Sequence, residues 1–199
     1  MDTKTLWIIS AIGLGVIGWV LQRGANSLSR RTLAQVAMAV ALAMVLHQLK
    51  IYRLPQGGSI TAGSMVPLLL VAWAYGPWAG MLAGLVFGMM TLMIGGYIVH
   101  PVQGILDYPL AYIALGVAGF FPKHQFFGGA MGLCGRFFCH FLAGIVFFSQ
   151  YAWVGWSPWI YSLALNGLFI FLEGGLCLLI VRLLPLDRLI NAMRGMAYK

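Results

Sequence analysis

The segment HPVQGILDYP, residues 100–109, separates two long apolar runs and contains Asp107, one of only four acidic residues in the 199-residue chain. An ionisable side chain is costly in hydrocarbon, so it usually faces a protein interior or a watery cavity and has a partner. We therefore expect Asp107 to face a ligand. Asp followed closely by Pro109 is also a common helix-start signal, so the same residue is expected to cap a helix that opens at Tyr108. The two roles are compatible.

Aromatic residues cluster around this acid in the sequence, at Tyr97, Tyr108 and Tyr112. Aromatic ring faces attract cations. A carboxylate among tyrosines therefore favours a flat, positively charged ligand that is held by ion pairing and by stacking.

The composition is that of an integral membrane protein. Hydrophobic residues make up 61% of the chain and charged residues 8%, whereas a typical soluble domain has roughly 25% charged residues. Apolar runs of about 20 residues recur, and each is long enough to cross a hydrocarbon core of about 30 Å as a helix. We expect an all-α, polytopic membrane helix bundle with no separate soluble domain.

The net charge of +8 does not indicate nucleic-acid binding, because the basic residues lie at the ends of apolar runs. This distribution is typical of cytoplasmic loops in membrane proteins. Cys134, Cys139 and Cys177 lie inside apolar segments without the paired spacing of metal ligands. We expect neither a metal site nor a disulfide from them.

Seven apolar runs predict seven membrane helices. No small-residue cleavage site follows the first run, so we expect a retained helix rather than a signal peptide. The third run is short and ends at Gly76 and Pro77, where the next helix begins directly. In that fourth helix three glycines at four-residue spacing allow close approach of another helix. The runs cover residues 5–22, 31–50, 66–75, 78–99, 108–121, 126–148 and 159–184, and the glycines are Gly80, Gly84 and Gly88.

Lys and Arg are unevenly divided between the two ends of the predicted bundle. Eight lie on one side, namely Arg23, Arg30, Arg31, Lys123, Arg182, Arg188, Arg194 and Lys199, and three on the other, namely Lys4, Lys50 and Arg53. The excess predicts that the first side, with the C-terminus, is cytoplasmic and that the N-terminus is outside. The polar, glycine-rich loop 54–64, Asp107 and the aromatic loop 149–158 then share the outer side. We expect a pocket open to the exterior with loop 54–64 as its lid.

These features divide the chain into three parts. Residues 1–30 form an extra N-terminal transmembrane helix and a basic linker, and residues 31–185 form a six-helix core. Residues 186–199 are expected to form a basic amphipathic tail on the cytoplasmic surface.

The predicted helix 126–148 carries His140, Gly144 and Phe148 on one face, because they are spaced by four residues. A lone histidine is commonly a structural, hydrogen-bonded residue, but with this glycine and ring beside it the face also suits a pocket wall. Tyr161 and Asn166 lie in the first half of the last helix.

Arg136 and Glu173 are expected to pair. Arg136 lies about ten residues into a helix that rises from the cytoplasmic side, and Glu173 lies about eleven residues before the end of a helix that descends to it, so their depths agree. Each would be costly alone in the membrane. The alternative is that Glu173 faces a partner protein.

Four stretches together resemble the substrate-binding S components of energy-coupling-factor vitamin transporters, and in particular their thiamine-specific branch. The resemblance covers residues 32–185. It is most specific in AMAVALAMVL (37–46), DYP (107–109), RFFCHFLAGIVFF (136–148) with QYA after it, and WIYSLALN (159–166). It implies a six-helix membrane fold, to which residues 1–30 add one helix.

The resemblance also implies a set of thiamine-binding residues. The acid before Tyr-Pro contacts the positively charged vitamin, and tyrosines, a His-Gly pair, a stacking ring and a Tyr-Asn pair complete the pocket. In this chain the matching residues are Asp107, Tyr97, Tyr108, His140, Gly144, Phe148, Tyr161 and Asn166. The family acid is usually Glu and the stacking ring usually Trp, so Asp107 and Phe148 leave open a related ligand such as a hydroxymethylpyrimidine precursor.

The resemblance further implies partners: a membrane T component and two cytoplasmic ATPases. The chain has no phosphate loop of the GxxxxGK[ST] type, so ATP hydrolysis must come from such partners. Ala37 and Ala41 match the family's small-residue docking motif, and Ala39 with Ala43 is the alternative face. Close packing inside the bundle also explains this spacing.

A competing interpretation is an intramembrane enzyme that uses His140 and a carboxylate. The chain has no HExxH or GxSxG pattern and no paired acids at helical spacing. We therefore expect no catalysis and no cofactor, with thiamine as ligand.

Overall fold

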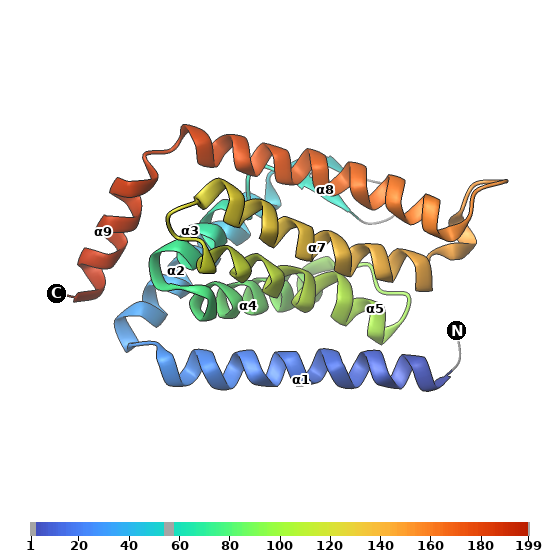
Figure 1. The fold of residues 1–199 in the computed structure, drawn as a ribbon, viewed down its shortest axis with the longest axis horizontal. Helices are drawn as coiled ribbons and strands as arrows, with labels where there is room; N and C mark the ends of the chain where they lie inside the picture. The colour runs from blue at the N-terminus through green and yellow to red at the C-terminus, as the bar shows by residue number, and fades with distance from the viewer. Residues whose placement is uncertain (1–2, 54–57, 199) are drawn as a thin grey trace.

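Apolar helices account for almost the whole structure, which is a computed structural model that describes residues 3–53 and 58–198 (Figure 1). Four consecutive segments between residues 101 and 120 form one continuous helix, which we call the Asp107 helix. In chain order the elements are α1 (Thr3–Ser27), α2 (Arg30–Gln48), strands β1 (Lys50–Arg53) and β2 (Ser59–Thr61), α3 (Val66–Tyr75), α4 (Pro77–Gly95), α5 (Pro101–Ile105), the π-helical turn η1 (Leu106–Leu110), α6 (Ala111–Ile113), the 3-10 segment η2 (Ala114–Phe120), α7 (Gln125–Phe147), η3 (Ser149–Tyr151), α8 (Pro158–Leu183) and α9 (Leu186–Tyr198).

Within residues 3–53 and 58–198, five helices are long and apolar enough to cross a membrane: residues 6–24 of α1, α4, the Asp107 helix, α7 and α8. The all-α membrane bundle is therefore as expected. Two of the seven predicted spans, α2 and α3, are not among these five. Helix α2 has 19 residues but carries two arginines in its first turn. The ten residues of α3 rise about 15 Å, roughly half of a hydrocarbon core.

The two ends of the bundle contain different connections and different chain termini (Figure 1). The α1–α2 connection, the start of α7, and α9 with the C-terminus lie at one end (Figure 1). The N-terminus and the connection between α7 and α8 lie at the other end. The basic segments that we assign to the cytoplasmic side are thus gathered at one end.

The break between α3 and α4 lies where the sequence predicts it. Gly76 has a φ of +89°, a left-handed backbone conformation that residues with a side chain rarely adopt. Pro77 then occupies the first turn of α4, where its missing N–H costs no hydrogen bond. The short helix is thereby folded back directly into the next one.

The glycine face of α4 is packed against the Asp107 helix, as its spacing predicts. A Cβ at Gly88 would lie 2.7 Å from the carbonyl oxygen of Tyr108, and one at Gly84 would overlap the carbonyl of Tyr112. Only glycine permits this backbone-to-backbone approach. The close contact fixes the depth of Asp107 relative to α4.

The expected capping role of Asp107 is wrong. The helix begins two turns earlier, at Pro101, and its N-cap is His100, whose Nδ1 accepts a 3.1 Å hydrogen bond from the backbone N–H of Val102. Asp107 lies inside the helix, in the π-helical turn η1, where Ala111 donates its N–H to the carbonyl of Leu106. Pro109 has no N–H, so this turn is wider than a regular α-helical turn. The carboxylate is consequently free to face the interior.

Part of the predicted glycine-rich loop 54–64 is a strand instead. Strand β2 pairs with β1 in an antiparallel hairpin that was not predicted from the sequence. Lys50 pairs with Thr61, Tyr52 with Ile60 and Arg53 with Ser59, with an irregularity between Lys50 and Tyr52. Residues 54–57 of the expected lid lie outside the described residues. Thr61, at the end of the hairpin, is fully buried against α8.

The tail helix α9 is amphipathic as expected, but it packs on the protein as well. Ile190 is buried in the main core. Arg194 donates 3.0 Å hydrogen bonds from Nε to the carbonyl of Ala74 and from Nη2 to that of Trp73, and the Tyr75 hydroxyl donates to the carbonyl of Met193. The carbonyls at the end of α3 are thus satisfied by the tail.

The extra helix α1 lies along α4 and the Asp107 helix (Figure 1). Val20 is buried in a cluster with Met81, Leu85 and Ile113. Nearer its N-terminus, Gly13 faces the Asp107 helix. A Cβ at this position would lie 3.0 Å from Ile105 Cγ2 and 3.2 Å from Leu110 Cδ1, whereas a Cβ at Gly15 would meet nothing within 4 Å.

These two glycines form a matched pair for a stability test. Gly13→Leu should destabilise the protein by about 1–3 kcal/mol, because the added atoms overpack the contact with Ile105 and Leu110. Gly15→Leu gains the same helix propensity without the clash and should not destabilise. Thermal unfolding of both purified variants in detergent measures the difference. Equal melting temperatures would show that α1 does not pack on the Asp107 helix as described.

Candidate ligand-binding cavity

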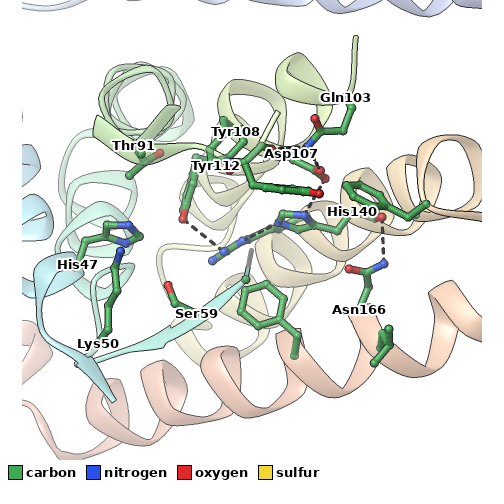
Figure 2. Close-up of a pocket in the computed structure, with 18 of the residues that line it drawn as sticks. His47, Lys50, Ser59, Thr91, Gln103, Asp107, Tyr108, Tyr112, His140 and Asn166 are labelled. Atoms are coloured by element: carbon green, nitrogen blue, oxygen red, sulfur yellow. Dashed lines mark hydrogen bonds and ion pairs between the residues drawn. The ribbon is translucent and has the colours of Figure 1, made fainter. Parts of the chain in front are cut away.

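A cavity lies between the Asp107 helix, α7, α8 and the hairpin (Figure 2). Its volume, measured as the space open to the centres of water molecules, is about 140 Å³. The lining residues are His47, Lys50, Gly58, Ser59, Thr91, Gly95, Tyr97, Gln103, Asp107, Tyr108, Tyr112, Arg136, His140, Gly144, Phe148, Tyr161, Leu165, Asn166 and Phe169.

The structure brings all eight predicted ligand-binding residues to the wall of this one cavity. They come from four places in the chain that are up to 69 positions apart, counting from Tyr97 to Asn166. The α4–α5 connection provides Tyr97, the Asp107 helix provides Asp107 and Tyr108, α7 and its end provide His140, Gly144 and Phe148, and α8 provides Tyr161 and Asn166. Their role in ligand binding stays a prediction.

Asp107 is held by two side chains at the edge of the cavity. Gln103, one helical turn earlier, donates from Nε2 to Asp107 Oδ2 at 2.7 Å, and His140 Nδ1 lies 2.8 Å from Oδ1. Gln103 is itself fixed, because its Nε2 also donates to the carbonyl of Tyr97 and its Oε1 accepts from the N–H of Val99. The carboxylate therefore has a defined orientation before any ligand arrives.

The contacts of His140 determine its tautomer. Arg136 Nε carries a hydrogen and has no acceptor capacity, so the His140 Nε2 that lies 3.4 Å away must accept. The ring proton is then on Nδ1 and is donated to Asp107. This neutral tautomer leaves the charge of Asp107 uncompensated by His140.

Arg136 and Glu173 form the predicted ion pair. Arg136 Nη2 lies 3.0 Å from Glu173 Oε2 in a charge contact that lacks the alignment of a hydrogen bond, and the two side chains are 3% and 1% exposed. Glu173 Oε1 accepts from the Thr61 hydroxyl at 3.2 Å. Because Glu173 is buried, the alternative that it faces a partner protein is wrong.

The guanidinium of Arg136 has further partners in the core. Its Nη2 donates to the Tyr112 hydroxyl at 3.3 Å, and its carbon lies 4.5 Å from the centre of the Tyr112 ring and 5.5 Å from that of Phe169. A buried cation is thus stabilised by a carboxylate and by ring faces. Arg136 is also one of the residues that line the cavity.

Aromatic rings form the outer side of the cavity. Tyr97 and Phe148 stack with ring centroids 6.2 Å apart, Phe148 also lies beside Tyr151, and Trp153 meets Tyr161 edge to face at 5.9 Å. Tyr108 accepts a 2.7 Å hydrogen bond on its hydroxyl from the N–H of Tyr97. The aromatic residues of loop 149–158, which the sequence predicts on the outer side, therefore also support the pocket rings.

The α8 side of the cavity offers an unused acceptor. Asn166 Nδ2 donates to the carbonyl of His140 at 3.2 Å and to the Ser162 hydroxyl at 3.1 Å. Within the described chain nothing donates to Asn166 Oδ1, so this oxygen is free for a ligand. Gly144 is required for the arrangement, because a Cβ there would lie 2.7 Å from Asn166 Nδ2.

Several lining residues were not assigned to the pocket from the sequence. Gln103 and Arg136 lie one helical turn before Asp107 and His140, so the four-residue spacing was a usable signal. His47, Lys50 and Thr91 come from segments that face the cavity only through tertiary packing.

The two candidate docking faces of α2 differ in exposure. Ala37 and Ala41 are exposed, whereas Ala43 is fully buried and Ala39 packs against the core. Only the first pair is accessible to another protein. Their role in docking stays a prediction.

An apolar helical bundle with a cavity lined by polar and aromatic side chains is typical of a membrane protein that binds a small ligand. Residues 33–191 match the thiamine transporter protein family, and the chain belongs to that family. The match begins after α1, which is thus additional to the shared core.

Individual relatives agree with this assignment. The thiamine transporter ThiT of Bacillus subtilis is 30% identical over an alignment that covers 76% of this chain and 88% of the relative. ThiT of Lacticaseibacillus paracasei is 33% identical over 52% of this chain and 61% of the relative. A solved structure of ThiT from Listeria monocytogenes superposes with a TM-score of 0.69 at 25% identity, covering 83% of this chain and 96% of that one. These relatives are named as transporters, not as enzymes.

The buried ion pair generates a stability prediction. Glu173→Gln leaves the Arg136 charge buried without its counter-ion, so we expect a loss of roughly 3–5 kcal/mol in unfolding free energy. Asp187→Asn removes an exposed acid on α9 and serves as the control, with little expected change. Thermal unfolding in detergent compares the two, and a Glu173→Gln protein as stable as the control would refute the pairing.

Proposed function

We propose that this chain is the thiamine-binding S component of an energy-coupling-factor transporter and that thiamine binds in the cavity beside Asp107. Membership of the thiamine transporter protein family and the names of the ThiT relatives support the ligand. The observation that carries the proposal is the Asp107 carboxylate, oriented by Gln103 and by a neutral His140 and facing the cavity.

The thiazolium ring of thiamine carries a permanent positive charge that suits this carboxylate. In a cavity shielded from water their ion pair is worth more than an exposed pair, for which the median is about 0–1 kcal/mol. Tyr97, Tyr108, Phe148 and Tyr161 provide ring faces, and each contact with a cation contributes about 0.5–2 kcal/mol.

The aminopyrimidine ring of thiamine needs directional hydrogen bonds. Asn166 Oδ1 is an acceptor without a partner among the described residues, and an exocyclic amino group is a donor. An interaction between them would distinguish the aminopyrimidine from other flat rings. Asn166 is therefore the residue that we assign to this ring.

Asp107→Asn tests the ligand. Removing the charge from one partner of a buried contact should weaken thiamine binding by tens to thousands of fold, equivalent to roughly 2–5 kcal/mol. An uncharged hydroxymethylpyrimidine should lose much less. Titration of the purified protein, followed by tryptophan fluorescence, measures both affinities.

The same titrations separate the two candidate ligands, and Asp187→Asn again serves as control. Unchanged thiamine binding by Asp107→Asn would refute the thiamine proposal. Binding of the pyrimidine alone by the unmodified protein would replace thiamine with its precursor as ligand.

We further propose that a membrane T component and two cytoplasmic ATPases energise transport. The chain has no phosphate loop of its own. The C-terminus is assigned to the cytoplasm of the cell that carries the protein in its plasma membrane, because basic residues are concentrated at that end. The exposed pair Ala37 and Ala41 is the contact that we assign to the T component, since small side chains permit close helix approach.

Bulky substitutions on α2 test the docking contact. Ala37→Leu and Ala41→Leu should abolish uptake by cells while thiamine binding by the isolated protein stays within about twofold, because the residues face away from the cavity. Ala43→Leu, at a buried position, should instead destabilise the isolated protein by about 1–3 kcal/mol. Loss of binding in the Ala37 and Ala41 variants would place these residues in internal packing.

A further inference from the structure

A second cavity lies at the basic end of the bundle, between the start of α7, the end of α8 and the start of α9 (Figure 1). Its volume, also measured as the space open to the centres of water molecules, is about 440 Å³. It shares no lining residue with the ligand cavity. We call it the basic groove, and its lining includes Phe126, Arg182, Leu184, Leu186, Asp187 and Arg188.

A break in the chain at Pro185 brings two arginines to this groove. Helix α8 ends because Leu184 has an extended backbone, with a ψ of 146°, and the proline after it cannot continue the helical hydrogen bonds. Helix α9 begins directly after the proline. Arg182, in the last turn of α8, and Arg188, in the first turn of α9, therefore line the same groove.

Neither of these arginines has a partner in the protein. Within residues 3–53 and 58–198 their guanidinium groups form no ion pair and no hydrogen bond, and both side chains are exposed. Two other arginines differ, because Arg136 pairs with Glu173 and Arg194 donates to two backbone carbonyls. A planar guanidinium group can bind a phosphate group through two parallel hydrogen bonds. The groove thus offers two such groups.

The groove carries a net positive charge. Asp187 also lines it, in the first turn of α9, where the helix dipole favours an acid. This acid forms no ion pair with a described residue. One acid against two arginines leaves one positive charge, and Lys123, two residues before α7, adds another at the same end. A positive surface of this kind attracts anions.

Apolar side chains adjoin the two arginines. Leu184 and Leu186 form part of the groove and pack against the main core. Phe126 and Leu183 are 60% and 77% exposed, which in a membrane protein places them in lipid. The 26 residues of α8 rise about 39 Å, more than a hydrocarbon core of about 30 Å. The last turn of α8, with Arg182, therefore lies at the level of the lipid headgroups.

We propose that the basic groove binds an anionic phospholipid from the leaflet at this end of the bundle, which is the cytoplasmic leaflet in the assigned topology. The phosphate group of the lipid lies between Arg182 and Arg188, and its acyl chains follow Phe126 and Leu183 into the hydrocarbon. The site is separate from the ligand cavity, so the inference goes beyond the proposed function and does not depend on the transported ligand.

Only an anionic lipid matches both parts of the groove. A soluble phosphate would use the arginines but would leave the apolar side chains beside them uncovered. A lipid with a choline headgroup would cover the apolar side chains but would bring a positive charge to the arginines. Phosphatidylglycerol combines acyl chains with a net negative headgroup. Each arginine near an anionic membrane surface contributes about fivefold to binding, so the pair contributes roughly 25-fold.

Lipid titrations of the purified protein test the site. The protein in detergent is mixed with phosphatidylglycerol or with phosphatidylcholine that has the same acyl chains, and native mass spectrometry measures how much lipid is bound. Replacing both arginines by glutamine (Arg182→Gln and Arg188→Gln) should weaken phosphatidylglycerol binding roughly 25-fold. Phosphatidylcholine binding should stay within about twofold. Replacing both by lysine should retain most of the phosphatidylglycerol affinity, because the charges remain.

The matched control removes two exposed arginines of α2 at the same end of the bundle but outside the groove (Arg30→Gln and Arg31→Gln). Its phosphatidylglycerol binding should stay within about twofold of the unmodified protein. Thermal unfolding without lipid checks that each variant is folded. In the unmodified protein, inorganic phosphate at millimolar concentration should not displace the lipid, because it lacks acyl chains.

Four outcomes would overturn the lipid site. The unmodified protein could bind the two lipids equally well, or the glutamine variant could bind phosphatidylglycerol as tightly as the unmodified protein. An equal loss in the control would indicate general attraction to the basic end. Displacement of the lipid by inorganic phosphate would assign the groove to a soluble anion. Normal lipid binding by the glutamine variant, together with lost uptake by cells, would assign the arginines to a partner protein.

Discussion

Two ionisable groups in the middle of an apolar bundle have to neutralise each other, and Arg136 and Glu173 impose this constraint on the rest of the structure. Both are almost inaccessible and lie on neighbouring helices, α7 and α8. Removing either would leave an uncompensated buried charge. The two helices are consequently held at one relative depth, which also sets the height of His140 and Asn166 on the cavity wall.

The pair also connects the hairpin with Asp107. Glu173 accepts from Thr61 of β2 on one side, and Arg136 donates to His140 on the other. His140 then donates a hydrogen bond from its Nδ1–H to Asp107. Arg136 is neutralised by Glu173, so Asp107 has no counter-ion among the described residues. In the proposed function the thiamine cation supplies one, which would explain an acid in a membrane interior.

Periodicity and depth predicted much of this arrangement. The five membrane-length helices follow from apolar length, the break at Gly76 from the glycine and proline there, and the Arg136–Glu173 pair from helical rise, and all three depend on local sequence. Asp107 was misassigned as a cap because Asp closely before Pro109 is a start signal, whereas the helix begins at Pro101 with His100 as its cap. The hairpin was missed because glycine-rich sequence favours a loop equally well, and its strands are stabilised by burial of Thr61 under α8. Lys50 lines the cavity because it is the first residue of that hairpin.

The helix α1 poses a separate energetic question, since lipid tails are as apolar as the face that it covers. Hydrophobic burial therefore contributes little to its association, and close packing has to provide the stabilisation. Gly13 brings its backbone against Ile105 and Leu110, which flank Asp107 in the sequence. At the other end Trp78 is met edge to face by Trp19 at 4.5 Å and by the Arg23 guanidinium at 5.8 Å. The wide turn at Pro109 gives up regular helical hydrogen bonding to orient Asp107. A rigid neighbour packed against that turn restricts its movement in a way that fluid lipid does not.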